Sequence, residues 1–240
     1  MLSGTVTALY RWPVKSLRGE ALTSARLDER GLAGDRAYTL IDQRPQRAGT
    51  RLTVRQVPGM LAWEAAYPAT CDGSPEPAGE PVLYSPTGAA YAWNDPELPA
   101  ALAESYGIPL ELRAAAGQQD RGPTVLVTFE ASRRALSEEL GAEVDVRRFR
   151  PNVHLDTGLP AFAEEAYGEG FSLTIGETTL EIIGPDSGPC IRCAVPSWDV
   201  HGRERWPELQ KHLIVTHENK FGLIMRVTRA GTVAIGDPVS

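Results

Sequence analysis

The stretch "TVLVTFEASRRALSEELG", Thr124 to Gly141, decides how the second half of this 240-residue chain is read. Its first six residues are apolar or β-branched and predict a buried strand. The following "EASRRALSEELG" predicts a helix that ends at Gly141. The pattern of the chain changes at the loop-like "AAAGQQDRG", residues 114–122, which lies just before this stretch. We therefore predict two parts, residues 1–115 and residues 116–240.

The first part consists of short β-rich pieces separated by turns. Residues 2–12, 21–29 and 36–42 have strand composition, and Pro13, "KSLRGE" and "RGLAGD" separate them. Closely spaced strands with glycine and proline between them predict a small barrel or sandwich.

Two later segments of the first part are of other types. "TCDGSPEPAGEP", residues 70–81, is dense in glycine and proline and predicts an exposed loop. "DPELPAALAESYGI", residues 95–108, predicts a short helix that Asp95 caps, with Pro96 in its first turn, and that Gly107 ends.

The second part continues with strands and one more helix. Residues 171–183 predict a hairpin that turns at residues 176–177, and residues 204–213 predict a helix. The final stretch, residues 221–239, predicts two strands around a turn at Gly231. The expected fold class is mixed α/β and dominated by β structure.

Composition excludes several classes of function. Hydrophobic residues make up 42% of the chain and charged residues 23%, a balance typical of soluble globular proteins. The net charge of −7 argues against general affinity for nucleic acid. The N-terminus lacks the apolar core of a signal peptide, and no apolar run approaches the roughly 20 residues of a membrane span. We expect a cytoplasmic protein with neither nucleic-acid nor membrane partners.

Three cysteines, an odd number, do not predict a disulfide framework. Cys71 lies far upstream, whereas "CIRC" places Cys190 and Cys193 at C-x-x-C spacing. One reading is structural zinc, because His212 and His217 stand at H-x4-H spacing, although the linker is longer than that of a zinc finger. A redox dithiol is a second reading, and two small buried thiols beside a turn are a third.

Several basic and amide side chains lie on turns that proline or glycine constrains. Lys15 and Ser16 follow Pro13, Arg36 follows a glycine-rich turn, and Arg150 precedes Pro151. In an acidic protein, such fixed cations favour an anionic ligand, because arginine offers phosphate a planar fork and lysine a point charge. Together with a thiol, they suggest a metal cofactor that carries phosphate.

These stretches resemble the MOSC-domain proteins, in the two-domain form with a MOSC N-terminal β-barrel, which includes the mitochondrial amidoxime-reducing components and their bacterial counterparts. The matching motifs are "LYRWPVKSLRGE", "GLAGDRAYTLID", "RLTVRQVPGML", "VTFEASRRAL", "RRFRPNVHL", "AFAEEAYGEGFSLTIG", "CIRC" and "FGLIMRVTRAGTVAIGDPV". The resemblance implies a small N-terminal β-barrel-like domain, residues 1–115, and a C-terminal MOSC β-barrel domain with a few helices, residues 116–240.

The resemblance also implies a ligand. Members of the family bind molybdenum cofactor, a pterin dithiolene with a terminal phosphate, and one cysteine thiolate binds the metal. The motif match gives this catalytic, metal-binding role to Cys193. Arg192 either lowers the pKa of that thiol or is simply solvated. The cofactor contacts carried over from the family are Lys15, Ser16, Arg36, Ser132, Arg150 and Asn152.

The function that the resemblance implies is an oxidoreductase that reduces N-hydroxylated small molecules. The sequence has no cysteine cluster for an iron–sulfur centre and no glycine-rich dinucleotide fingerprint. Electrons would therefore come from a separate ferredoxin- or cytochrome-type protein and its reductase. The alternative is a carrier that binds molybdenum cofactor, or sulfur, without turnover.

Overall fold

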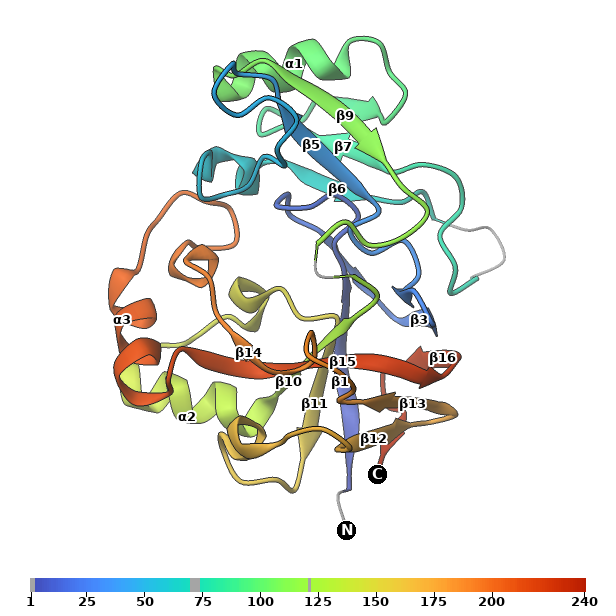
Figure 1. The fold of residues 1–240 in the computed structure, drawn as a ribbon, viewed down its shortest axis with the longest axis vertical. Coiled ribbons are helices and arrows are strands. Elements are labelled where there is room, and N and C mark those ends of the chain that lie inside the picture. Colours follow the sequence, from blue (N-terminus) through green and yellow to red (C-terminus); the bar gives the residue numbers. More distant parts are fainter. Residues whose placement is uncertain (1–2, 70–73, 121) are drawn as a thin grey trace.

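The computed structural model describes residues 3–69, 74–120 and 122–240, and β structure dominates it (Figure 1). Its strands are β1 (Gly4–Arg11), β2 (Glu20–Leu22), β3 (Ser24–Asp28), β4 (Gly31–Leu32), β5 (Tyr38–Asp42), β6 (Glu64–Ala66), β7 (Val82–Tyr84), β8 (Ala90–Ala92), β9 (Leu110–Ala114), β10 (Val125–Phe129), β11 (Val153–Thr157), β12 (Ser172–Ile175), β13 (Thr178–Glu181), β14 (Gly188–Ile191), β15 (Lys220–Arg229), β16 (Gly231–Ala234) and β17 (Pro238–Val239). The α-helices are α1 (Leu98–Tyr106), α2 (Glu130–Leu140) and α3 (Pro207–Thr216), and the short 3-10 helices are η1 (Pro58–Ala62), η2 (Val146–Phe149), η3 (Ala163–Ala166) and η4 (Val195–Ser197). The expected β-dominated fold with a few helices is confirmed.

Seven strands close into a barrel in the lower lobe of Figure 1. The order around the barrel is β10, β11, β1, β17, β12, β13 and β15, and β15 pairs back onto β10. Within this ring only β10 and β11 run parallel, and the other neighbours are antiparallel. Strand β14 extends the sheet beyond β15. The barrel interior is filled by apolar side chains that include Val6, Leu9, Val127, Val153 and Leu223.

A glycine permits the closing contact between β15 and β10. Gly222 has a φ of 76°, and a Cβ on it would lie 2.6 Å from the carbonyl oxygen of Val127. A real side chain would collide with that backbone, so only glycine allows the two strands to approach this closely. This explains why the apolar "FGLIM" stretch contains a glycine.

The upper lobe is formed by the chain between β5 and β9 (Figure 1). It contains the two-stranded sheet β5–β9, the three-stranded sheet β6–β7–β8, and helix α1. Its core includes Leu40, Leu52, Trp63, Leu83 and Leu102.

The predicted division at residues 115 and 116 remains a prediction, and the packing crosses it. Strand β1 lies in the barrel between β11 and β17, although it precedes the division by a hundred residues. Strand β3 pairs with β16 near the end of the chain. The barrel is therefore built from both predicted parts.

The local sequence predictions have mixed outcomes. The buried strand β10, the end of α2 at Gly141 and the hairpin β12–β13 are confirmed. Helix α1 ends at Gly107 as expected, but it begins at Leu98 after Glu97, and Asp95 caps the preceding turn instead by accepting a bond from the Glu97 N–H, 2.8 Å.

The two strands expected around Gly231 are confirmed, but they do not pair with each other. Strands β15 and β16 both exist, but β16 pairs with β3 in a separate sheet, because the chain leaves the barrel after Arg229.

Cys71 and the first part of the expected loop at 70–81 lie outside the described residues. None of the helices within the described ranges has the length and apolar character needed to cross a membrane.

Candidate functional site

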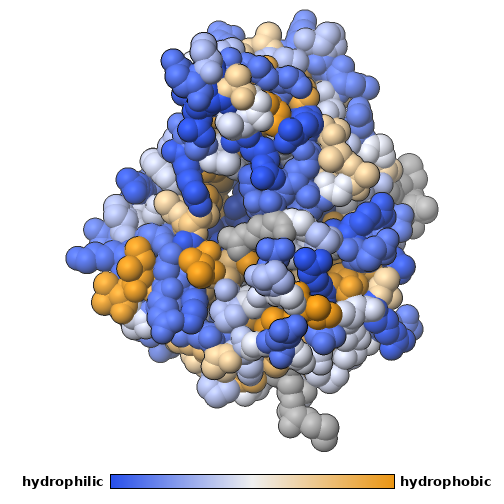
Figure 2. Space-filling view, in the orientation of Figure 1, coloured by the Kyte–Doolittle hydropathy of each residue, from blue (hydrophilic) through white to orange (hydrophobic). Residues whose placement is uncertain are grey.

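A cavity of about 420 Å³ is lined by residues of the N-terminal segment, the upper lobe and the barrel. The surface is hollowed and mostly hydrophilic where the two lobes meet (Figure 2). In the described part of the chain, one acidic side chain, Asp120, lines this cavity. The basic side chains that line it are Lys15, Arg36, Arg51, Arg55, Arg150 and Arg192. This excess of positive charge in an acidic protein suits an anionic ligand.

Most of the residues predicted from the sequence meet in this cavity. Lys15, Ser16, Arg36, Arg150, Asn152 and Cys193 all line it. The side chain of Asn152 is already bonded, since its Oδ1 accepts from the Leu126 N–H, 3.1 Å, and its Nδ2 donates to the Tyr10 carbonyl, 3.4 Å. Asn152 therefore fixes β10 and β1 beside the cavity.

Ser132 is not brought to the cavity, so its expected role as a cofactor contact has no support in the geometry. Its side chain is fully buried on α2. The hydroxyl donates to Glu164 Oε2, 2.8 Å, and accepts from the Phe162 N–H, 2.9 Å. Ser132 instead ties α2 to the segment around η3.

Three of the cavity residues have a left-handed backbone. The φ angles are 71° for Ser16, 49° for Arg36 and 57° for Arg150. Residues with a Cβ adopt this region at a cost of about 1 kcal/mol or more each, and such strain clusters at functional sites. The tight turns that the sequence analysis identified thus aim these side chains at one point.

Arg150 is buried with an unused hydrogen-bond donor. Its Nη1 donates to the Leu17 carbonyl, 2.7 Å, while its Nη2 is buried and has no hydrogen-bond partner among the described residues. Burial, reinforced by the nearby charge of Arg36, lowers the pKa of Arg150 to about 9, so the side chain stays protonated at neutral pH. A buried cation with a free N–H is the feature expected where an anion binds.

Lys15 and Arg36 lie next to Arg150 and share acidic partners. Lys15 forms an ion pair with Asp120, and Arg36 forms ion pairs with both Asp35 and Asp120. Arg36 Nη2 also donates to the Arg150 carbonyl, 3.1 Å. Burial lowers the pKa of Lys15, and Asp120 offsets this only in part. The cluster keeps a net positive charge that these carboxylates do not fully neutralise.

The two cysteines have different environments. Cys190 is buried and accepts a bond from Arg192 Nη1, 2.9 Å, while Arg192 Nη2 donates to the Phe149 carbonyl, 2.6 Å. Cys193 is half-buried and lines the cavity. Burial by itself would raise the pKa of the Cys193 thiol, but Arg192, the Val195 N–H and Arg55 together outweigh it and lower the pKa. Of the two expectations for Arg192, the structure supports the one that favours the thiolate.

Sequence reasoning missed Arg51 and Arg55 as site residues. Both lie just before η1 and face the cavity. They belong to "RLTVRQVPGML", a stretch that carried the family resemblance, and that resemblance was the available signal.

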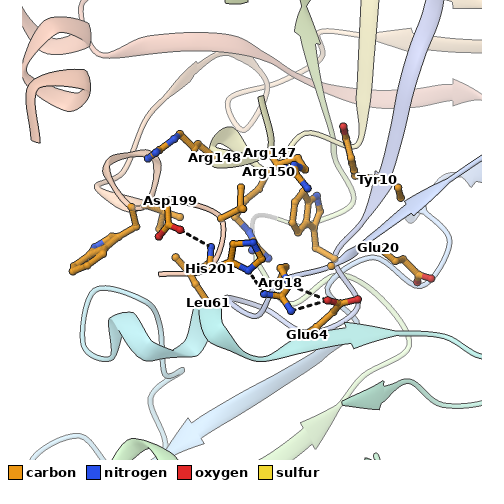
Figure 3. A pocket seen from close by; sticks show the side chains of 16 residues that line it. Tyr10, Arg18, Glu20, Leu61, Glu64, Arg147, Arg148, Arg150, Asp199 and His201 are labelled. Atoms are coloured by element: carbon orange, nitrogen blue, oxygen red, sulfur yellow. Dashed lines mark hydrogen bonds and ion pairs between the residues drawn. The ribbon is translucent and has the colours of Figure 1, made fainter. Parts of the chain in front are cut away.

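Figure 3 shows a second cavity, of about 350 Å³. It adjoins the first, because Arg150 and Val195 contribute to the walls of both. Tyr10, Trp12 and Trp198 supply aromatic surface. Across the cavity Arg18 donates to Glu64 Oε2, 2.9 Å, and contacts His201 Nδ1. This second space is mixed in character, with aromatic, acidic and basic walls.

The zinc set Cys190, Cys193, His212 and His217 does not form. Among the described residues, His212 and His217 gather with Glu139, and neither cysteine belongs to that group. The cysteines instead lie at the charged cavity.

Two family models match the chain. Residues 117–240 match the MOSC domain, and residues 3–77 match the MOSC N-terminal beta barrel domain. The chain belongs to the MOSC-domain family. MOSC domains are associated with binding of molybdenum cofactor.

One solved structure shows the same fold. The YUAD protein of Bacillus subtilis has a TM-score of 0.50 at 12% identity, covering 100% of this MOSC chain and 96% of its own. YiiM of Geobacillus stearothermophilus is 22% identical, with a TM-score of 0.37, over 48% of this chain and 52% of its own. No curated protein matches the sequence.

Proposed function

We propose that this MOSC protein is a molybdenum-cofactor-dependent reductase of N-hydroxylated small molecules. The observation that carries the proposal is that a thiol with a lowered pKa, Cys193, and a buried guanidinium with an unused N–H, Arg150, line one cavity. A ligand with a soft-metal end and an anionic end satisfies both.

The residues of the cavity fit the two ends of molybdenum cofactor. Cys193 would supply the protein thiolate, because a soft, deprotonated sulfur suits a metal that already has dithiolene ligands. Lys15, Arg36 and Arg150 would hold the phosphate, since Arg150 has a free donor and the other two flank it. Arg192 and Arg55 would keep Cys193 in its thiolate form.

The second cavity supports an enzyme over a carrier. The Val195 N–H bonds the Cys193 sulfur, and Val195 also forms part of the second cavity. A small organic substrate in that space would contact Val195, two residues after Cys193, whereas a carrier has no need of such a space. When bound, the cofactor supplies the two-electron chemistry that removes the oxygen of an N–OH group.

His201 can donate a hydrogen bond to a substrate in the second cavity. Arginine only donates hydrogen bonds, so the contact with Arg18 makes His201 Nδ1 an acceptor and puts the ring proton on Nε2. The reducing electrons would come from a separate ferredoxin- or cytochrome-type protein.

The test is turnover by protein loaded with molybdenum cofactor. A chemical reductant and a panel of amidoximes and hydroxylamines should give many product molecules per bound molybdenum, while NADPH without a redox partner should give none. Protein from a host that cannot make the cofactor is the control. Full molybdenum loading with no turnover on any substrate would refute the reductase and favour the carrier.

A further inference from the structure

A second group of metal-ligating side chains lies away from the charged cavity, where α2 meets α3. Figure 1 shows both helices on the same side of the barrel lobe, and Leu136 of α2 packs in one cluster with Leu209 and Leu213 of α3. Glu139 lies in the last turn of α2, His212 lies on α3, and His217 follows the last residue of α3.

Three ligand atoms converge at this junction. Glu139 Oε2 lies 2.7 Å from His212 Nε2 and 2.9 Å from His217 Nε2. One ligand atom from each residue can be chosen so that all lie within 4.8 Å of one another. Two imidazole nitrogens and one carboxylate oxygen therefore surround a single point.

A fourth residue fixes one of these rings. His217 Nδ1 lies 2.8 Å from Glu165 Oε1, and the ring stacks on Phe162 with 3.8 Å between centroids. A histidine whose Nδ1–H donates to a carboxylate presents the lone pair of Nε2 on the other side, which is the arrangement of metal-bound histidines.

That arrangement brings two hydrogen-bond acceptors, one from His217 and one from Glu139, into contact. With Nδ1–H directed at Glu165, the Nε2 lone pair of His217 faces an oxygen of Glu139, so two acceptors meet at 2.9 Å. Either a proton or a metal ion must separate them. The Nε2 atom of His212 points at the same oxygen, and a metal ion can satisfy all three atoms at once.

We propose that Glu139, His212 and His217 bind one divalent metal ion of the zinc class, with Glu165 holding His217 in position. Two histidines and one glutamate form a known zinc ligand set that leaves a fourth place for water. The side chains of Glu139 and His212 are 34% and 24% exposed, which gives an ion and a water access, while His217 is 7% exposed.

The ion would fasten α3 to α2. The leucines of α3 pack in one cluster with Phe149, whose carbonyl accepts from Arg192 beside the cysteines. The metal site thus secures the outer layer behind the charged cavity without belonging to it. The inference does not depend on the reductase proposal.

The experiment titrates Co²⁺ and then Zn²⁺ into untagged full-length protein treated with a chelator, with absorption and calorimetry as readouts. Cobalt bound by nitrogen and oxygen gives visible bands without the near-ultraviolet charge-transfer band of thiolate ligands. We expect one equivalent per chain with that signature and a rise in melting temperature on binding.

Variants assign the ligands. His212→Gln and Glu139→Gln should abolish the stoichiometric binding, and Glu165→Gln should weaken it about 10- to 100-fold, the usual effect of losing an outer-sphere partner. Glu138→Gln, the exposed neighbour of Glu139 on the same helix, is the matched control and should bind as the wild type does.

Three outcomes would overturn the proposal. One is the absence of a stoichiometric ion in the wild type. Another is a thiolate band that survives His212→Gln, which would place the ion at the cysteines. The last is equal affinity in Glu139→Gln and Glu138→Gln.

Discussion

The guanidinium of Arg150 lies over the indole ring of Trp12, with 4.3 Å from Cζ to the ring centroid. The contact is reciprocal, because Trp12 Nε1 donates to the carbonyl of Pro151, the residue after Arg150, at 2.8 Å. The stacking and the hydrogen bond together fix the residue after β1 against the residues after η2. Arg150 is thus clamped in a fixed orientation before any ligand binds, which lowers the entropy cost of binding.

Removal of Arg150 or Lys15 should release the cofactor. Truncating one partner of a buried, charge-assisted contact costs about 2–5 kcal/mol, so Arg150→Ala or Lys15→Ala should reduce cofactor affinity by orders of magnitude. Arg150→Lys should also lose affinity, because lysine lacks the planar fork and the stacking surface. Molybdenum per chain after gel filtration measures the effect. Arg134→Ala, an exposed arginine on α2, is the control, and unchanged molybdenum in Arg150→Ala would contradict the shared phosphate site.

The two cysteines should differ on substitution. Cys193→Ser should lose molybdenum and reductase activity, since its thiolate is the proposed metal ligand. Cys190→Ser should keep most of both, because a serine hydroxyl can still accept the bond from Arg192. Elemental analysis of both variants checks this, and equal losses in the two would refute the assignment of Cys193.

The thiol of Cys193 should react at lower pH than an ordinary cysteine. Only the thiolate is alkylated, and the pKa of Cys193 is lowered, so in cofactor-free protein its alkylation should rise with an inflection below the ordinary value of 9.0. Arg55→Met should move that inflection upward. Mass spectrometry of the Cys193 peptide measures the rate against pH.

Arg51→Met is the matched control for this measurement, since Arg51 lines the same cavity but is not among the groups that lower the pKa of Cys193. The same inflection in wild type and Arg55→Met would show that Arg55 does not act on the thiol.

Glu130 should make part of the stability depend on acid pH. Hydrogen bonds from Arg133, opposed by burial and supported by His154, lower the pKa of Glu130 from 4.5 to about 2. A depressed carboxyl pKa stabilises the fold above the unfolded value, and this contribution is lost as the pH falls from 4.5 through about 2. Urea unfolding of wild type and Glu130→Gln should therefore differ at pH 6 and converge toward pH 2. A constant difference across this range would argue against the ionised state of Glu130 as the cause.

Local features of the fold were readable from the sequence, whereas pairings distant in the chain were not. The apolar run of β10 and the glycine after α2 carry their own signals, since Gly141 ends the helix with a φ of 64°. Strand β16 has no comparable signal for its partner, because nothing in its residues distinguishes pairing with β3 from pairing with β15. The partner of β16 was not predicted for this reason.

In the candidate site, too, local sequence signals predicted some residues, whereas others depend on contacts between distant segments. The turn residues Ser16, Arg36 and Arg150 were predictable because proline and glycine neighbours restrict the backbone around them. Ser132 was misplaced because a motif position does not reveal which way a helix faces, and here it faces Glu164. Arg55 and the junction of Glu139 with the two histidines depend on tertiary contacts between distant segments.

Strand β1 also constrains how the protein can be made. Gly4 pairs with Val239, so the barrel closes only when β17, which is synthesised long after β1, is available. Until then the edge of β1 that pairs with β17 exposes unpaired N–H and C=O groups, which are prone to pair with other chains. We therefore expect the barrel to fold only after synthesis has reached β17. A fragment of residues 116–240 expressed alone should be insoluble, and adding residues 1–37 as a separate peptide should rescue it.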